Sequence, residues 1–203
     1  MEEVVLGFTN YFHAIFTTSN PSRIGDYIAR IKKSMDGSMN ASLMKEFTKK
    51  EVGAALSQMG PLKLPSPDGL PAAFYHEHWS SVGDEVCNVV LNFLNSGVFN
   101  EVNHTYIALI RKIKDPIKAS DFRPISLCNV LYKIISKPLA NRLKLILLDI
   151  ISPNQRAFVP ARLIFDNITA AYETMHSMQT QMWSKIGYMA LKLDMSKVYD
   201  RVE

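Results

Sequence analysis

The sequence contains few of the features that mark membrane proteins, secreted proteins and zinc modules. No uninterrupted apolar stretch approaches the roughly 18–20 residues that a membrane-spanning helix requires. The N-terminus lacks the basic and then apolar order of a secretory signal. The two cysteines, Cys87 and Cys128, match neither a disulfide framework nor the spacing of a zinc site. These absences favour an intracellular protein, in the nucleus or the cytoplasm, without a membrane partner.

Several common catalytic motifs are also absent. The sequence has no glycine-rich phosphate loop, no dinucleotide-binding glycine fingerprint and no nucleophile elbow. His76-Glu77-His78 lacks the i, i+4 spacing of a zinc helix, which favours structural histidines. A hydrolase with Asp194 as its nucleophile would need a general acid nearby, and only Asp200 has an obvious spacing. These motifs therefore point away from a zinc enzyme or a hydrolase.

The positive charge of the chain is concentrated in one segment. The net charge is only +4, but residues 101–163 hold eleven Lys or Arg and four Asp or Glu, hence +7, which leaves −3 for the rest. Such a segment could follow nucleic-acid phosphates, and Arg111 and Lys112 are its first candidates for that contact. Charge alone gives equal weight to a solvated, lysine-rich surface.

The hydrophobic pattern predicts a mostly helical chain with a few strands. Apolar residues at helical spacing predict helical regions, and a shorter period predicts strands or extended segments. The helical regions are 24–31, 43–59, 130–147 and 166–182, with two more between them: one that starts at Pro71 and a stronger one through 86–94 that ends at Gly97. The strands or extended segments are 105–110, 121–127 and 187–194. We expect a kink or a break at Pro138, because an interior proline removes a helical hydrogen bond. Asp166 is expected to cap the last helix, and the methionine-rich stripe of that helix is expected to lie in a core.

Asp194 ends the last predicted strand on its less apolar side, where a carboxylate could bind a metal ion. Taken alone, an aspartate after a strand is more often a turn or helix-capping residue. Phosphoryl transfer by two metal ions, roughly 3.5–4 Å apart, also needs more carboxylates than one. A metal role for Asp194 therefore depends on what surrounds it.

Several blocks together resemble the reverse transcriptase of LINE-type, non-LTR retrotransposons, and in particular the lineage abundant in plants. The first fingers block of that family resembles residues 121–137 and 139–144, which begin Asp121-Phe122-Arg123-Pro124-Ile125-Ser126-Leu127. The second resembles Asn154-Gln155-Arg156-Ala157-Phe158-Val159-Pro160 with Arg162. Pro67-Asp68-Gly69 is similar to the block before the fingers, and residues 187–203 resemble the strand of motif A.

The resemblance implies an α+β fold: an incomplete right-hand polymerase with its fingers and the start of its palm. It divides the chain into a helical N-terminal extension or linker (1–60), a fingers region (61–186) and a truncated first palm strand with motif A (187–203). The parent reaction is RNA-directed DNA synthesis from deoxynucleotide triphosphates, with a DNA primer, an RNA template and two Mg²⁺ ions. Motif B, motif C and the thumb have no counterpart, so the isolated chain is expected to be inactive, and whether it is an enzyme is left open.

The resemblance also implies roles for single residues. Asp194 matches the first metal-binding aspartate, and the backbone carbonyl of Met195 is expected to help hold a metal. Tyr199 matches the aromatic residue that crowds the 2′ carbon of the sugar and so selects deoxynucleotides. Arg123 would face the incoming triphosphate, because a guanidinium fork suits phosphate oxygens. Two further positions lie near the template and the nucleotide: Gln155 and Arg162.

The chain departs from the family pattern at Leu64, Ser66, Pro138, Ala161 and Val198. Ala161 stands where the family has a glycine before Arg162. Val198 stands where the family has an alanine, and its larger side chain would narrow the nucleotide pocket. One alternative is a noncatalytic nucleic-acid-binding or interaction remnant that uses residues 101–163. Another is a translated fragment that does not fold stably, because the last strand would leave an uncovered sheet edge.

Overall fold

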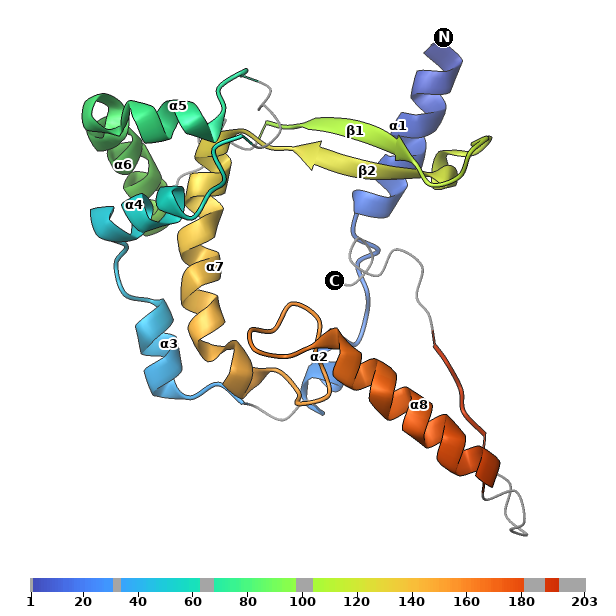
Figure 1. The fold of residues 1–203 in the computed structure, drawn as a ribbon. Coiled ribbons are helices and arrows are strands. Elements are labelled where there is room, and N and C mark those ends of the chain that lie inside the picture. Colours follow the sequence, from blue (N-terminus) through green and yellow to red (C-terminus); the bar gives the residue numbers. More distant parts are fainter. Residues whose placement is uncertain (1, 31–33, 63–67, 98–103, 181–188, 194–203) are drawn as a thin grey trace. The chain divides into compact units, whose positions relative to one another are not determined.

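A computed structural model describes residues 2–30, 34–62, 68–97, 104–180 and 189–193 (Figure 1). The chain forms two compact units: a core unit, Met35–Ile146, and a terminal unit, Met1–Ser34 with Leu147–Glu203. Most of the described elements are helices, and the described strands form one two-stranded antiparallel sheet. The prediction of a mostly helical α+β chain with antiparallel strands is confirmed at this level.

Four helices bury the apolar side chains of the core unit. They are α4 (Lys49–Ser57), α5 (Ala72–Glu77), α6 (Trp79–Ser96) and α7 (Val130–Ile150). Val52, Val90 and Ile134 have no exposed surface and bring α4, α6 and α7 into one cluster. Burial of a side chain of this size contributes about 1.5–3 kcal/mol, so this cluster is the main source of stability in the unit.

The predicted helical region 43–59 begins too early, because a capping box starts its helix, α4, only after Thr48. Before it, α3 (Gly37–Leu43) ends at Leu43. Thr48 then takes an extended conformation, its hydroxyl accepts a hydrogen bond from the N–H of Glu51, and the Glu51 carboxylate accepts one from the N–H of Thr48. This reciprocal pair satisfies two N–H groups that a helix start leaves without partners.

The start of α5 and the end of α6 lie where the sequence predicts them. Gly69 has a φ of 75°, which agrees with the predicted turn, and Pro71 occupies the N-cap of α5. Gly97 ends α6 with a φ of 71°, a left-handed conformation that glycine adopts without steric cost.

The predicted strands 105–110 and 121–127 are confirmed as β1 (Tyr106–Arg111) and β2 (Phe122–Leu127), which form a hairpin. Of the expected kink or break at Pro138, the break is wrong, because α7 continues through this residue over 21 residues. Pro138 is fully buried in the core unit. Apolar burial of its ring offsets part of the roughly 3 kcal/mol that an interior proline costs.

The terminal unit contains α1 (Glu2–Phe16), α2 (Ile24–Ile28) and α8 (Ile164–Thr180). Asp166 is not the cap of α8, since the helix begins two residues earlier; it lies in the first turn, where a negative charge also favours the helix dipole. The prediction of a core stripe on α8 is wrong for its described residues, because Ile168, Tyr172 and Met175 are more than half exposed.

The predicted last strand is not formed over residues 189–193, which have no regular secondary structure. Met189, Leu191 and Leu193 are each more than 70% exposed. A strand is held by hydrogen bonds to a neighbouring strand, and the only described sheet is the hairpin in the core unit. Alternating hydrophobicity is therefore not sufficient to form the strand here. No helix among the described residues is long and apolar enough to cross a membrane.

Candidate functional site

Three of the predicted ligand-binding residues, Arg111, Lys112 and Arg123, lie on the hairpin of the core unit. The register places Arg111 opposite Phe122 and Arg123 opposite Ile110. Opposed residues of an antiparallel pair share a face, whereas successive residues alternate between faces. Arg111 and Arg123 therefore point to opposite faces of the hairpin, and one bound phosphate cannot contact both in this register.

The turn of the hairpin is closed by hydrogen bonds that converge on Asp121. One carboxylate oxygen of Asp121 accepts from the backbone N–H groups of Lys118 at 2.9 Å and Ile117 at 3.0 Å. The bond from Lys118 and then the bond from Ile117 lower the pKa of the Asp121 carboxyl. The carboxylate is therefore charged at neutral pH and keeps the turn closed.

Lys112 joins the two sides of the same turn. Its backbone N–H donates to the carbonyl oxygen of Asp121 at 2.7 Å, and its ammonium donates to the carbonyl oxygen of Ser120 at 2.7 Å. An ammonium has three N–H groups, so this contact leaves two for a ligand. Arg111, Lys112 and Arg123 are all exposed, and none of their charged groups lies within 4 Å of a carboxylate in the described part of the chain.

Arg162, in the terminal unit, donates to four backbone carbonyl oxygens. Its Nη1 lies 2.6 Å from the oxygen of Ser152 and 2.8 Å from that of Gln155. Its Nη2 lies 3.3 Å from the oxygen of Leu148 and 3.4 Å from that of Ile151. These carbonyls follow the last helical hydrogen bonds of α7 and lack helical partners, and a cation is favourable at that end of a helix. Arg162 therefore holds the loop that carries Gln155 against the end of α7.

The loop 152–162 contains two backbone conformations that favour glycine. Phe158 has a φ of 63° and Ala161 has a φ of 60°. A left-handed conformation costs a residue with a Cβ roughly 1–2 kcal/mol. This gives a physical reason for the glycine expected at position 161. The side-chain amide of Gln155 donates to the carbonyl of Ala157 at 3.2 Å and is otherwise exposed.

The remaining predicted site residues, Asp194, Met195 and Tyr199, lie outside the described residues. No group of three or more His, Cys, Asp or Glu side chains that could hold a metal ion occurs in the described ranges.

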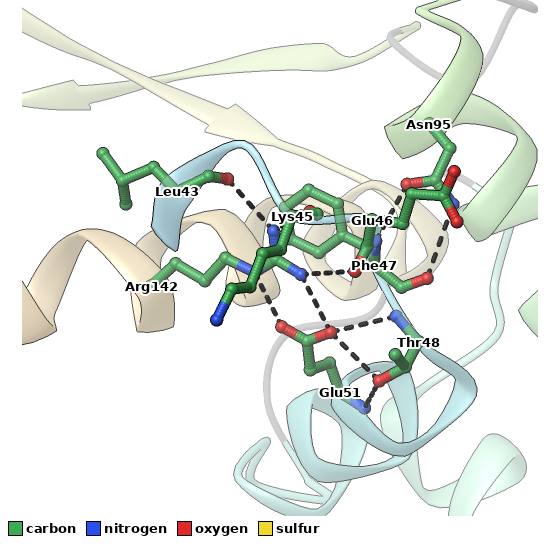
Figure 2. A network of polar contacts seen from close by, with 8 residues as sticks. All are labelled: Leu43, Lys45, Glu46, Phe47, Thr48, Glu51, Asn95 and Arg142. Carbon is green, nitrogen blue, oxygen red and sulfur yellow. Dashed lines mark hydrogen bonds and ion pairs between the residues drawn. The ribbon is translucent and has the colours of Figure 1, made fainter. Parts of the chain in front are cut away.

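Sequence reasoning missed the most heavily bonded cation of the core unit, Arg142 of α7 (Figure 2). Its Nε and Nη2 lie 2.7 Å and 3.0 Å from the two carboxylate oxygens of Glu51. The other bonds go to the backbone carbonyls of Leu43, Lys45 and Glu46. Only 12% of the Arg142 side chain is exposed.

The aromatic ring of Phe47 completes the surroundings of Arg142. The guanidinium carbon lies 3.5 Å from the centroid of this ring, a cation–π contact. Phe47 is fixed in turn by its backbone N–H, which donates to the side-chain oxygen of Asn95 at 2.9 Å. The sequence signal that could have indicated this network is the capping-box pattern of Thr48 and Glu51, which places a carboxylate at the start of α4.

Residues 110–203 match the family model described as reverse transcriptase (RNA-dependent DNA polymerase). A second similarity is to a Xenopus laevis protein described as the uncharacterized 149 kDa protein of transposon TX1. That protein is 31% identical over 154 residues, which are 75% of this chain and 12% of the relative. The chain thus spans about an eighth of the length of this relative. The matched family segment begins within β1 and includes Arg111, Lys112, Arg123 and the loop with Gln155 and Arg162.

Proposed function

We propose that this chain is part of an RNA-directed DNA polymerase encoded by a non-LTR retrotransposon of the LINE type. The match of residues 110–203 to the reverse transcriptase family supports this proposal. The sequence blocks resemble in particular the plant-type lineage of this family, and the similarity to a transposon protein supports a mobile element as the source. The hairpin and helices α5 to α8 would belong to the fingers (61–186), α1 to α4 to the N-terminal extension or linker (1–60), and residues 187–203 to motif A at the start of the palm.

The parent reaction adds deoxynucleotides to a primer end on an RNA template, in the nucleus or the cytoplasm. Arg123 is proposed to contact the triphosphate, with Tyr199 against the sugar. Asp194 and the carbonyl of Met195 are proposed metal ligands, and Mg²⁺ would supply charge stabilisation at the transferring phosphate when bound. The resemblance assigns one metal-binding aspartate to these 203 residues, so we propose that the isolated polypeptide does not extend a primer.

The hairpin geometry divides the proposed binding roles. Because Arg111 and Arg123 lie on opposite faces, Arg123 is assigned to the nucleotide and Arg111 to a nucleic-acid strand. Lys112, in the turn next to Arg111, is the second proposed contact to that strand. Gln155 is proposed to lie near the template. A nucleotide contact by Arg162 would have to replace bonds to four carbonyls, so we propose that Arg162 acts by holding the backbone of Gln155 in place.

The single observation that carries the strand-binding proposal is the exposure of the hairpin cations without a described carboxylate beside them. The test is binding of a labelled RNA–DNA primer–template to the 203-residue chain over a series of salt concentrations. Arg111→Gln and Lys112→Gln should each weaken binding and reduce the slope of log K against log salt by about one.

Lys50→Gln serves as the matched control, since Lys50 is exposed on α4, outside the basic segment. It should leave both the affinity and the slope unchanged. Binding that does not respond to salt, or that weakens equally in all three variants, would refute a strand site on the hairpin. Primer extension by the isolated chain that disappears in Asp194→Ala would refute the proposed inactivity.

A further inference from the structure

A cavity of about 400 Å³ lies in the core unit, away from the hairpin turn. It is bounded by the end of α4, the start of α5 and the first half of α7. Its volume is within the roughly 300–1,000 Å³ that is usual for small-molecule sites. Met59 and Ala140 give it an accessible apolar lining, and the nearly buried side chains of Ala72 and Val130 lie behind it. The hairpin residue Arg123 lies about 14 Å along β2 from Leu127, at the end of the strand remote from α7.

Two lysines of α7, Lys133 and Lys137, also line this cavity. They are four residues apart and so lie on one face of the helix, where two like charges repel each other. Both are only partly exposed, and the described residues provide no carboxylate within 4 Å of either ammonium. None of the described lining residues is acidic. The cavity therefore combines an apolar wall with two positive charges that lack a counter-charge among the described residues.

The lysines are the strongest hydrogen-bond donors at this cavity. Ser136, between them, donates its hydroxyl to the backbone carbonyl of Lys133 at 3.2 Å, so this proton is already committed. Each ammonium can present up to three N–H groups, and phosphate oxygens are strong acceptors for a charged donor. A ligand that suits the cavity thus has an anionic phosphate at one end and a flat or apolar group at the other.

We propose that this cavity binds a nucleotide unit, with its phosphate on Lys133 and Lys137 and its base or sugar against Met59 and Ala140. The unit is either a free nucleotide or one nucleotide of a single strand, since both present the same chemistry. The site is distinct from the turn of the hairpin, and none of its described lining residues is acidic. It does not depend on a divalent metal ion.

The test uses the full 203-residue chain in the presence of EDTA, which removes any contribution from a metal-dependent site. Deoxyadenosine 5′-monophosphate is titrated by NMR, and a short labelled single-stranded DNA by fluorescence anisotropy. Lys133→Gln and Lys137→Gln should each weaken binding roughly tenfold, because each removes a hydrogen bond between charged partners. Lys144→Gln, on the exposed surface of the same helix, is the matched control and should leave binding unchanged.

The two probes distinguish the sources of the nucleotide. Binding of the monophosphate with loss in the two cavity variants assigns the site to a free nucleotide, and the same loss with only the DNA strand assigns it to a strand. Absence of binding to both probes would overturn the proposal. So would equal loss in Lys144→Gln, or loss in Arg123→Gln without loss in the cavity variants. Circular dichroism of each variant verifies that it is folded, and Ala140→Leu, which fills the cavity without a charge change, should also block binding.

Discussion

Replacement of Arg142 by methionine should destabilise the core unit by about 3 kcal/mol, as the following contributions indicate. Methionine keeps much of the length of the side chain and removes its charge and its N–H groups. The ion pair with Glu51 is bidentate, and Arg142 is only 12% exposed, so the pair is partly buried. Removal of one partner from a buried pair costs about 3–5 kcal/mol; the lower end applies because the Glu51 side chain is 33% exposed and can be hydrated.

Two further contributions follow from the contacts of the guanidinium. Loss of the cation–π contact with Phe47 adds about 0.5–1 kcal/mol. The carbonyls of Lys45 and Glu46 belong to exposed residues, so water can replace the lost bonds at a small net cost. Methionine returns part of this energy through its own apolar burial, which brings the total to about 3 kcal/mol.

Urea unfolding followed by circular dichroism and tryptophan fluorescence measures this loss. Arg142→Lys retains one charge without the fork and should cost about 1–2 kcal/mol. Lys144→Met, at an exposed position of the same helix, is the control and should change the free energy of unfolding by less than about 0.5 kcal/mol. A loss below about 1 kcal/mol in Arg142→Met would show that the network adds little to stability, contrary to this reasoning.

The Glu51 side of the pair makes the effect depend on pH. The hydrogen bond from Arg142 holds the pKa of the Glu51 carboxyl below its ordinary value, with a smaller opposing effect of burial. A carboxyl whose pKa is lower in the folded state stabilises the fold above its unfolded pKa, and this contribution is lost as the pH falls through the folded value. Wild type should therefore lose stability more steeply than Arg142→Met as the pH falls below about 5. Glu51→Gln keeps the capping box and should remove the same acid sensitivity.

Three other substitutions or reactions test the local geometry. Ala161→Gly should stabilise the chain by about 0.5–1 kcal/mol in thermal unfolding, because glycine removes the left-handed strain but has a larger unfolded-state entropy; no gain would contradict the φ of 60°. Pro138→Ala should stabilise α7 by about 1 kcal/mol, since the regained helical bond exceeds the lost ring burial; a net loss would mean that packing dominates at this position. Cys128 should react with a thiol reagent in the native protein and Cys87 only after unfolding. The reason is that Cys87 is 4% exposed and burial raises the pKa of its thiol. Equal reaction rates of the two thiols would contradict the buried position of Cys87 on α6.

The sequence predicted elements well where local signals and burial agree. Gly97 both ends the apolar period of α6 and supplies the left-handed cap, so the end of that helix was predicted correctly. The hairpin strands were predicted from their β-branched and apolar residues, and each finds its partner in the other. Prediction failed where a tertiary contact decides. The ring of Pro138 is buried, and residues 189–193 have no described strand beside them.

The candidate site illustrates a different limit, because residue type does not reveal which cations are already bonded within the protein. Arg142 and Arg162 donate to carbonyl oxygens of the backbone, and Arg142 also to a carboxylate, so they stabilise loops. Among the described residues, Arg123 has no such partner, although it is also an arginine of the family blocks. A ligand that binds an already paired cation must first break the bonds of that cation within the protein, which costs more free energy than contacting a cation that faces water. The cations that remain open to a phosphate are therefore identified by their bonds in the folded chain. For this reason the family resemblance alone assigned similar roles to Arg123 and Arg162.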